Sequence, residues 1–206
     1  LVDWNHALRA ANPQAQDASF LGNHDMARIA GAARGDVAQL KQAMALSLFT
    51  TGHPFLYYGD ELGMRGSGKD ENKRLPMLWS ASNDGGCLPP VGADQEQRLK
   101  LGVAEQAADP SSLLNYVRAL IALRNRCPLL DDCDTSLIDT GLQAVAAYRC
   151  RSGDDACAVY HNLSDEAVTV STDETSLLGG LSVSGDVPTL NAQTLTLPPH
   201  SVCILQ

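Results

Sequence analysis

Carboxylates follow two short apolar segments of the sequence, where strand–helix folds gather their catalytic groups. Asp25 comes after Ala18–Gly22, and Asp60 and Glu61 come after the aromatic run Pro54–Tyr58. If the two segments were neighbouring strands, about 4.8 Å apart, Asp25 and Glu61 could approach the roughly 5–5.5 Å separation of a retaining glycosidase pair. The alternative interpretation is that Asp25 only caps a turn.

The residues around Asp25 add other polar groups. Asn23 and His24 place an amide and an imidazole directly before the carboxylate. Sugar hydroxyls both donate and accept hydrogen bonds, and such a mixture suits them. Alternatively, His24 is an ordinary loop histidine. Arg28 follows three residues after Asp25 and could either orient a carboxylate or form a surface ion pair.

Three aromatic residues could stack on sugar rings, namely Tyr57, Tyr58 and Trp79. For the two tyrosines, which lie on a predicted buried strand, a place in the core is the favoured interpretation. The run Lys69–Arg74 contains Asp, Glu and Asn, all oxygen ligands for calcium. It lacks the spacing of an EF-hand loop and alternates in charge, so we expect a solvated loop, no metal and no cofactor.

Composition excludes several classes of function. The 206 residues contain 15 Lys and Arg against 24 Asp and Glu, a net charge of −9. Scattered basic residues in an acidic chain argue against nucleic acid and against a polyanionic membrane surface. No apolar run approaches the roughly 20 residues of a membrane helix. Six cysteines are too few for a disulfide scaffold; free thiols are favoured over a Cys150–Cys157 bridge, although the two face each other across a predicted hairpin.

Helix and strand signals alternate in the first part of the chain. Asp3–Ala11 is predicted to be the end of a helix, and Asp36 to cap a helix that continues to Leu48. Asp109-Pro110 is predicted to open another helix, and the sequence from Gly59 to about Asp94 to be a long polar loop.

From about Leu129 the pattern changes to a period of two, which predicts short antiparallel strands. The change predicts two domains, residues 1–129 of α/β type and residues 130–206 forming an all-β sandwich. Five segments carry the strand pattern: Leu142–Arg149, Ala156–Asn162, Ala167–Ser171, Leu195–Leu197 and Val202–Leu205.

Four motifs, in order, resemble those of the alpha-amylase family of glycoside hydrolases. Phe20–Asp25 is similar to the F-x-x-N-H-D stretch, Gly52–Glu61 to G-x-P-x-x-Y-Y-G-x-E on the eighth barrel strand, and Arg74–Trp79 to the R-x-P-M-x-W loop. Residues 106–124 are similar to the last barrel helix. The resemblance covers residues 20–124 and extends more loosely to the terminal sandwich.

The resemblance implies a fold and a set of roles. The chain would contain the last two strand–helix units of a (β/α)₈ barrel, followed by a β-sandwich. The nucleophilic Asp and general-acid Glu would lie upstream of Leu1, so Asp25 and Glu61 would not be the catalytic pair. Asp25 would bind hydroxyls of the cleaved sugar and stabilise its transition state, with His24 binding the same sugar. We expect Arg28 to be a second substrate-binding residue. Glu61 would tether its loop.

Three functions follow as alternatives. The first is part of a retaining alpha-glucan hydrolase acting on alpha-glucans or maltooligosaccharides, with the fragment itself inactive and self-associating through its incomplete barrel. The second is a sugar-binding module without turnover. The third is a glucosyltransferase of the same family. The residues of this chain do not separate transfer from hydrolysis, because water and sugar acceptors compete at a part of the site built mainly by residues upstream of Leu1.

Overall fold

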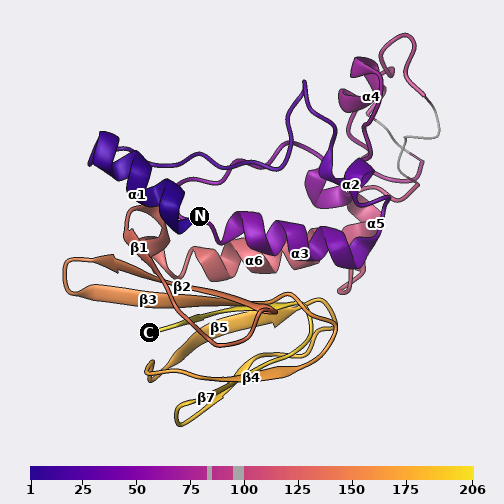
Figure 1. Cartoon of the computed structure of the whole chain (residues 1–206). Helices are drawn as coiled ribbons and strands as arrows, with labels where there is room; N and C mark the ends of the chain where they lie inside the picture. Colours follow the sequence, from indigo (N-terminus) through magenta and orange to yellow (C-terminus); the bar gives the residue numbers. More distant parts are fainter. Residues whose placement is uncertain (83–84, 95–99) are drawn as a thin grey trace. The chain divides into compact units, whose positions relative to one another are not determined.

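Figure 1 shows the computed structural model of the chain, which describes residues 1–82, 85–94 and 100–206. The chain forms two compact units, each assembled from separate stretches of sequence. The first, called here the loop unit, contains Phe20–Met44 and Phe55–Ala119. The second, the sheet unit, contains Leu1–Ser19, Ala45–Pro54 and Leu120–Gln206. The domain boundary predicted at residue 129 stays a prediction.

The first part of the chain is helical. No helix among the described residues is both long and apolar enough to cross a bilayer. The helices are α1 (Val2–Ala11), α2 (Ile29–Ala32), α3 (Val37–Leu48), α4 (Asp70–Lys73), α5 (Val103–Ala108) and α6 (Leu113–Arg124), with single 3₁₀ turns η1 (Asp60–Leu62) and η3 (Pro128–Asp131).

Helix capping confirms two of the predicted starts and stops. The Asp36 carboxylate accepts hydrogen bonds from the backbone N–H groups of Ala38 and Gln39, at 2.9 and 3.2 Å, and so caps α3. Helix α1 ends at Ala11 with Asn12 as its extended C-cap residue, as predicted.

The predicted start of the last helix is wrong by three residues. Helix α6 begins at Leu113, because the Ser112 hydroxyl accepts a hydrogen bond from the Asn115 N–H at 3.1 Å and acts as its cap. Asp109 and the preceding residues instead close the short helix α5. The predicted polar loop of residues 59–94 contains η1 and the one-turn helix α4, and its residues 83–84 lie outside the described residues.

The two strands predicted before Asp25 and Asp60 are wrong as continuous strands. Phe20 and Phe55 form one isolated parallel bridge, and their neighbours add no further ladder pairs among the described residues. The burial predicted for residues 54–58 is also wrong, since Phe55 is 64% exposed. A parallel ladder is stable when both faces of its sheet are covered, and here Phe20 and Phe55 are both exposed. No closed barrel is formed by the described residues.

The second part of the chain folds into antiparallel sheets, as predicted. One sheet has the order β1-β2-β3-β8-β5 and the other β4-β7-β6. The strands are β1 (Asp134–Leu137), β2 (Val145–Ser152), β3 (Asp155–Asn162), β4 (Val168–Ser171), β5 (Leu177–Ser182), β6 (Thr189–Asn191), β7 (Thr194–Leu197) and β8 (Ser201–Leu205). Strands β1, β5 and β6 were not predicted.

Side chains from both sheets enclose one core. Val145 and Tyr160 from the larger sheet pack with Val170 and Leu195 from the smaller one. In the predicted hairpin of β2 and β3, Cys150 lies opposite Cys157, and all six cysteines are free thiols, as favoured from the sequence.

Candidate functional site

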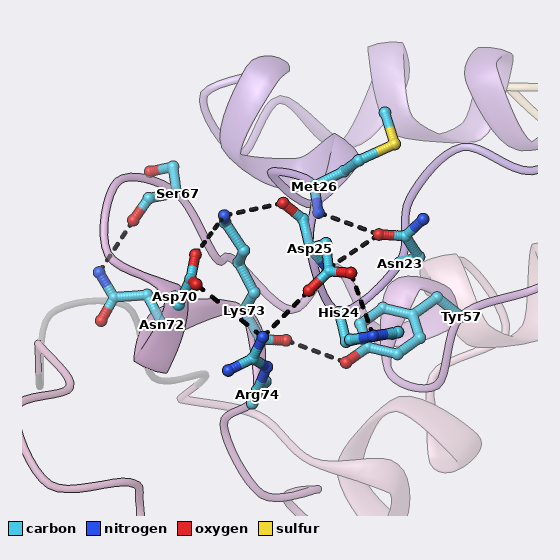
Figure 2. Close-up of polar contacts among 10 residues, drawn as sticks. All are labelled: Asn23, His24, Asp25, Met26, Tyr57, Ser67, Asp70, Asn72, Lys73 and Arg74. Carbon is cyan, nitrogen blue, oxygen red and sulfur yellow. Dashed lines mark hydrogen bonds and ion pairs between the residues drawn. The ribbon is translucent and has the colours of Figure 1, made fainter.

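An Asx turn presents Asp25 at the surface of the loop unit. The Asn23 side-chain oxygen accepts hydrogen bonds from the backbone N–H groups of Asp25 and Met26, at 2.8 and 3.0 Å (Figure 2). Asparagine mimics a backbone turn in this way and fixes the residues that follow it. The turn therefore sets the direction of the Asp25 side chain.

The Asp25 carboxylate is exposed, but both of its oxygens are held. Arg74 Nη2 lies 3.1 Å from Oδ1, and His24 Nε2 lies 3.2 Å from Oδ2 (Figure 2). The Asp25 side chain is 67% exposed. A carboxylate accepts up to about four hydrogen bonds, so this one retains acceptor sites that face solvent.

Lys73 stabilises the same turn through the Asp25 backbone. Its Nζ donates a hydrogen bond to the Asp25 backbone carbonyl at 2.9 Å and pairs with Asp70 at 2.8 Å. Its own carbonyl accepts hydrogen bonds from Arg28 Nε, at 3.1 Å, and from the Tyr57 hydroxyl, at 3.2 Å. One residue of α4 thus connects the Asp25 turn to the interior of the loop unit.

Arg28 is completely buried beneath the site. Its Nη1 lies 2.9 Å from Asp60 Oδ1 and donates a hydrogen bond to the Tyr58 carbonyl at 2.7 Å. The guanidinium carbon lies 4.2 Å from the centre of the Tyr57 ring and 4.8 Å from that of Tyr58. The surface ion pair considered for Arg28 is therefore wrong: the pair exists, but it is internal.

Burial dominates the electrostatics of the Arg28–Asp60 pair. Asp60 is 1% exposed, and desolvation raises the pKa of its carboxyl to about 6, although the Arg28 charge and hydrogen bond oppose the shift and Glu61 adds to it. Arg28 Nη2 and Glu61 Oε2 are buried without a hydrogen-bond partner among the described residues.

The structure places the predicted site residues in two environments, one at the surface and one in the interior. His24 and Asp25 share the surface cluster, whereas Arg28 lies in the interior and contacts Asp60. Trp79 is 52% exposed. Tyr57 and Tyr58 flank Arg28, and Tyr58 donates a hydrogen bond to the Leu75 carbonyl at 2.9 Å.

Sequence reasoning missed Lys73 and Arg74 as residues of this site. Both contact Asp25 from a position about fifty residues further along the chain. The available signal was the R-x-P-M-x-W pattern that begins at Arg74. The pattern indicates a family motif, but it does not indicate contact with the Asp25 turn.

The segment considered for calcium is held by its own ion pairs. Asp70 pairs with Lys73, and Lys69 lies 2.7 Å from Asp94, whose other carboxylate oxygen accepts a hydrogen bond from Asn72. Within the part of the chain that the structure describes, no group of three or more His, Cys, Asp or Glu side chains is placed to hold a metal ion.

Comparisons of sequence and of structure with known proteins both find alpha-amylases. The sequence profile of the alpha-amylase catalytic domain matches residues 2–133. Alpha-amylase 3 of Dictyoglomus thermophilum is 30% identical over 154 residues, and alpha-amylase SusG of Bacteroides thetaiotaomicron is 39% identical over 116 residues. The structure of Amy13B from Eubacterium rectale matches 99% of this chain with a TM-score of 0.91 and 30% identity.

The similarity extends over only part of each relative. The chain is matched over 74% of its length by the Dictyoglomus protein and over 55% by SusG, and these matches span 31% and 17% of the relatives' own lengths. It corresponds to 41% of the Amy13B chain.

Proposed function

The chain belongs to the alpha-amylase family of glycoside hydrolases, and from this premise we propose that it is the C-terminal part of a retaining enzyme that cleaves alpha-glucosidic bonds. The observation that carries the proposal is the exposed Asp25 carboxylate, oriented by an Asx turn and held at both oxygens. The proposed substrates are alpha-glucans and maltooligosaccharides.

Asp25 is proposed to stabilise the transition state. An ionised carboxylate accepts strong hydrogen bonds from sugar hydroxyls. Such bonds to the ring hydroxyls strengthen as the sugar distorts toward an oxocarbenium-like geometry, so they lower the barrier without any proton transfer. Arg74 and His24 contact opposite oxygens of the Asp25 carboxylate and fix its orientation.

His24 and Arg28 are proposed to have different roles. The His24 imidazole is exposed beside the carboxylate and can donate a hydrogen bond to the same sugar. Arg28 is 0% exposed and donates a hydrogen bond to the carbonyl of Lys73, which in turn holds the Asp25 turn. We therefore assign Arg28 a positioning role, in place of the direct contribution expected from the sequence.

The nucleophile and the general acid are proposed to lie outside these 206 residues. Glu61 is not assigned to the pair, because it lies in a 3₁₀ turn and one of its carboxylate oxygens is buried. On this proposal the chain by itself binds sugar weakly and does not hydrolyse it.

The test is hydrolysis of a chromogenic alpha-maltooligoside by the 206-residue chain and by a whole enzyme that contains it. The chain alone should be inactive. In the whole enzyme Asp25→Asn should lower kcat/KM about 10³-fold, a loss of about 4 kcal/mol of transition-state binding. Asp154→Asn, an exposed carboxylate in the β2–β3 turn, is the matched control. A loss below tenfold for Asp25→Asn would refute its role, and activity of the isolated chain would refute the missing pair.

A further inference from the structure

Four cysteines that are distant in sequence converge in the sheet unit. Cys127 follows α6, Cys133 precedes β1, and Cys150 and Cys157 lie on β2 and β3. Each is at most 2% exposed. We call these four residues the thiol quartet. They lie outside the site around Asp25, and the proposed function does not use them.

The members of the quartet contact one another in a definite order. The sulfurs of Cys127 and Cys157 are 3.4 Å apart in a hydrogen bond. The Cys150 thiol interacts with both Cys157 and Cys133. Cys133 lies two residues before Thr135, and Thr135 pairs with Cys150 in the β1–β2 register. This register brings Cys133 close to Cys150. The order of contacts is therefore 127, 157, 150, 133.

We propose that the thiol quartet is a double disulfide site, in which Cys127 bonds to Cys157 and Cys133 bonds to Cys150 when the chain meets a small-molecule disulfide such as oxidised glutathione. This pairing uses the thiol–thiol hydrogen bond already present and leaves two other neighbours to form the second bond. The two bonds are nested in the sequence. They would join the end of α6 and the start of β1 to the β2–β3 hairpin.

Each bond forms in two exchange steps. A cysteine thiolate attacks one sulfur of the glutathione disulfide, forms a mixed disulfide and releases one glutathione thiolate. The second cysteine then loses its proton to solvent and displaces the second glutathione. The two protein thiols are oxidised by two electrons in total, and one glutathione disulfide is reduced to two thiols.

Hydrogen bonds within the folded quartet shift the pKa values of its thiols in opposite directions. Cys127 and Cys150 both donate toward the Cys157 sulfur, which lowers the pKa of Cys157. The pKa of Cys127 is raised by its contact with Cys157 and by burial, and that of Cys150 by its contacts with Cys133 and Cys157 and by burial. Because the sulfurs are buried, exchange takes place in the unfolded or locally opened chain, and refolding is the condition in which to look for it.

The experiment refolds the full chain from urea in a mixture of reduced and oxidised glutathione, blocks remaining thiols with iodoacetamide under denaturing conditions, and maps the linked peptides. Cleavage after Lys and Arg and before Asp places each cysteine on its own peptide. The relevant peptides span 127–130, 132–133, 150–151, 155–164 and 186–206.

We expect two linked pairs, 127–130 with 155–164 and 132–133 with 150–151. The refolded chain should carry two alkylated cysteines, Cys87 and Cys203, compared with six after reduction. A link between 150–151 and 155–164, or six alkylated cysteines in the refolded chain, would overturn the proposal.

Two variants and a melting curve separate this pairing from its alternatives. Cys87→Ser, at an exposed position, should leave both links intact. Cys133→Ser should keep the 127–157 link and leave Cys150 to be alkylated; a switch to a 150–157 link would contradict the assignment. The oxidised wild-type chain should melt about 5–10 °C above the reduced chain, because cross-links restrict the unfolded state. Equal melting temperatures would also contradict it, because links between groups that are already neighbours in the folded chain should stabilise that chain.

Discussion

Asp25 and Arg28 are three residues apart, and burial assigns them opposite tasks. The Asp25 side chain is 67% exposed and available to a ligand, whereas Arg28 is fully enclosed by Asp60, Tyr57 and Tyr58. The sequence indicated that both residues matter, but burial of a single arginine depends on residues up to 45 positions away that satisfy it. The position of Asp25 could be predicted from its motif, and the internal location of Arg28 could not.

Replacing Arg28 tests the internal ion pair. Arg28→Met leaves the Asp60 carboxylate buried without its cation, so we expect a loss of about 3–5 kcal/mol in the free energy of unfolding at pH 7, measured by urea denaturation. The control Arg118→Met removes an exposed arginine that donates a hydrogen bond to Asn115 on the same helix, and should change the free energy by less than about 0.5 kcal/mol. Equal losses for the two variants would contradict the role of burial.

His161 is predicted to make stability depend on pH. It is buried on β3 against Phe49, and desolvation lowers its pKa to about 4. Its neutral form is favoured on folding, so its contribution is complete above the unfolded pKa of about 6.5 and is lost as the pH falls through about 4. Between pH 7 and pH 5 the wild-type free energy of unfolding should fall by about 2 kcal/mol more than that of His161→Gln. Parallel pH curves for the two proteins would exclude this contribution.

At the scale of elements, capping and alternation predicted most of what is observed. Asp36 starts α3 and period-two patterns locate β2, β3 and β8, because these signals are local. The parallel strands were mispredicted because such strands need partners on both sides, which a sequence window does not contain. The missed strand β5 has two glycines and pairs only with β8, so its signal is weak.

Close packing of the loop around Gly66 gives a test at this scale. A Cβ at Gly66 would lie 2.8 Å from the Asn72 carbonyl oxygen and 2.9 Å from Arg28 Cδ, so Gly66→Ala must displace α4 or the buried arginine. A Cβ at Gly22 would meet its neighbours at 3.6 Å or more, an ordinary contact. We expect Gly66→Ala to lower the free energy of unfolding by about 1–3 kcal/mol and Gly22→Ala by much less, measured by urea denaturation. A loss for Gly66→Ala no larger than that for Gly22→Ala would show that the loop adapts freely.

At the scale of the whole molecule, apolar side chains around the isolated parallel bridge are uncovered. Phe20 and Phe55 are 48% and 64% exposed. Exposed apolar groups beside an unpaired strand edge favour association. We therefore expect the sedimentation coefficient of the chain to rise with concentration, and Phe55→Ser to reduce this rise. Val91→Ser, which removes an even more exposed apolar side chain (98%) elsewhere in the loop unit, is the control. A coefficient independent of concentration would contradict the prediction.

The strand order of the larger sheet has a consequence for protein synthesis. Strand β5 is made before β8, yet β8 lies between β3 and β5 and is the partner with which β5 pairs. A nascent chain that has emerged as far as β5 therefore exposes two unpaired edges until β8 follows, and β8 inserts with all five of its residues buried. Synthesis from the N-terminus leaves this sheet open until a fully buried strand arrives, and a ribosome paused between β5 and β8 would hold the chain with these two edges exposed.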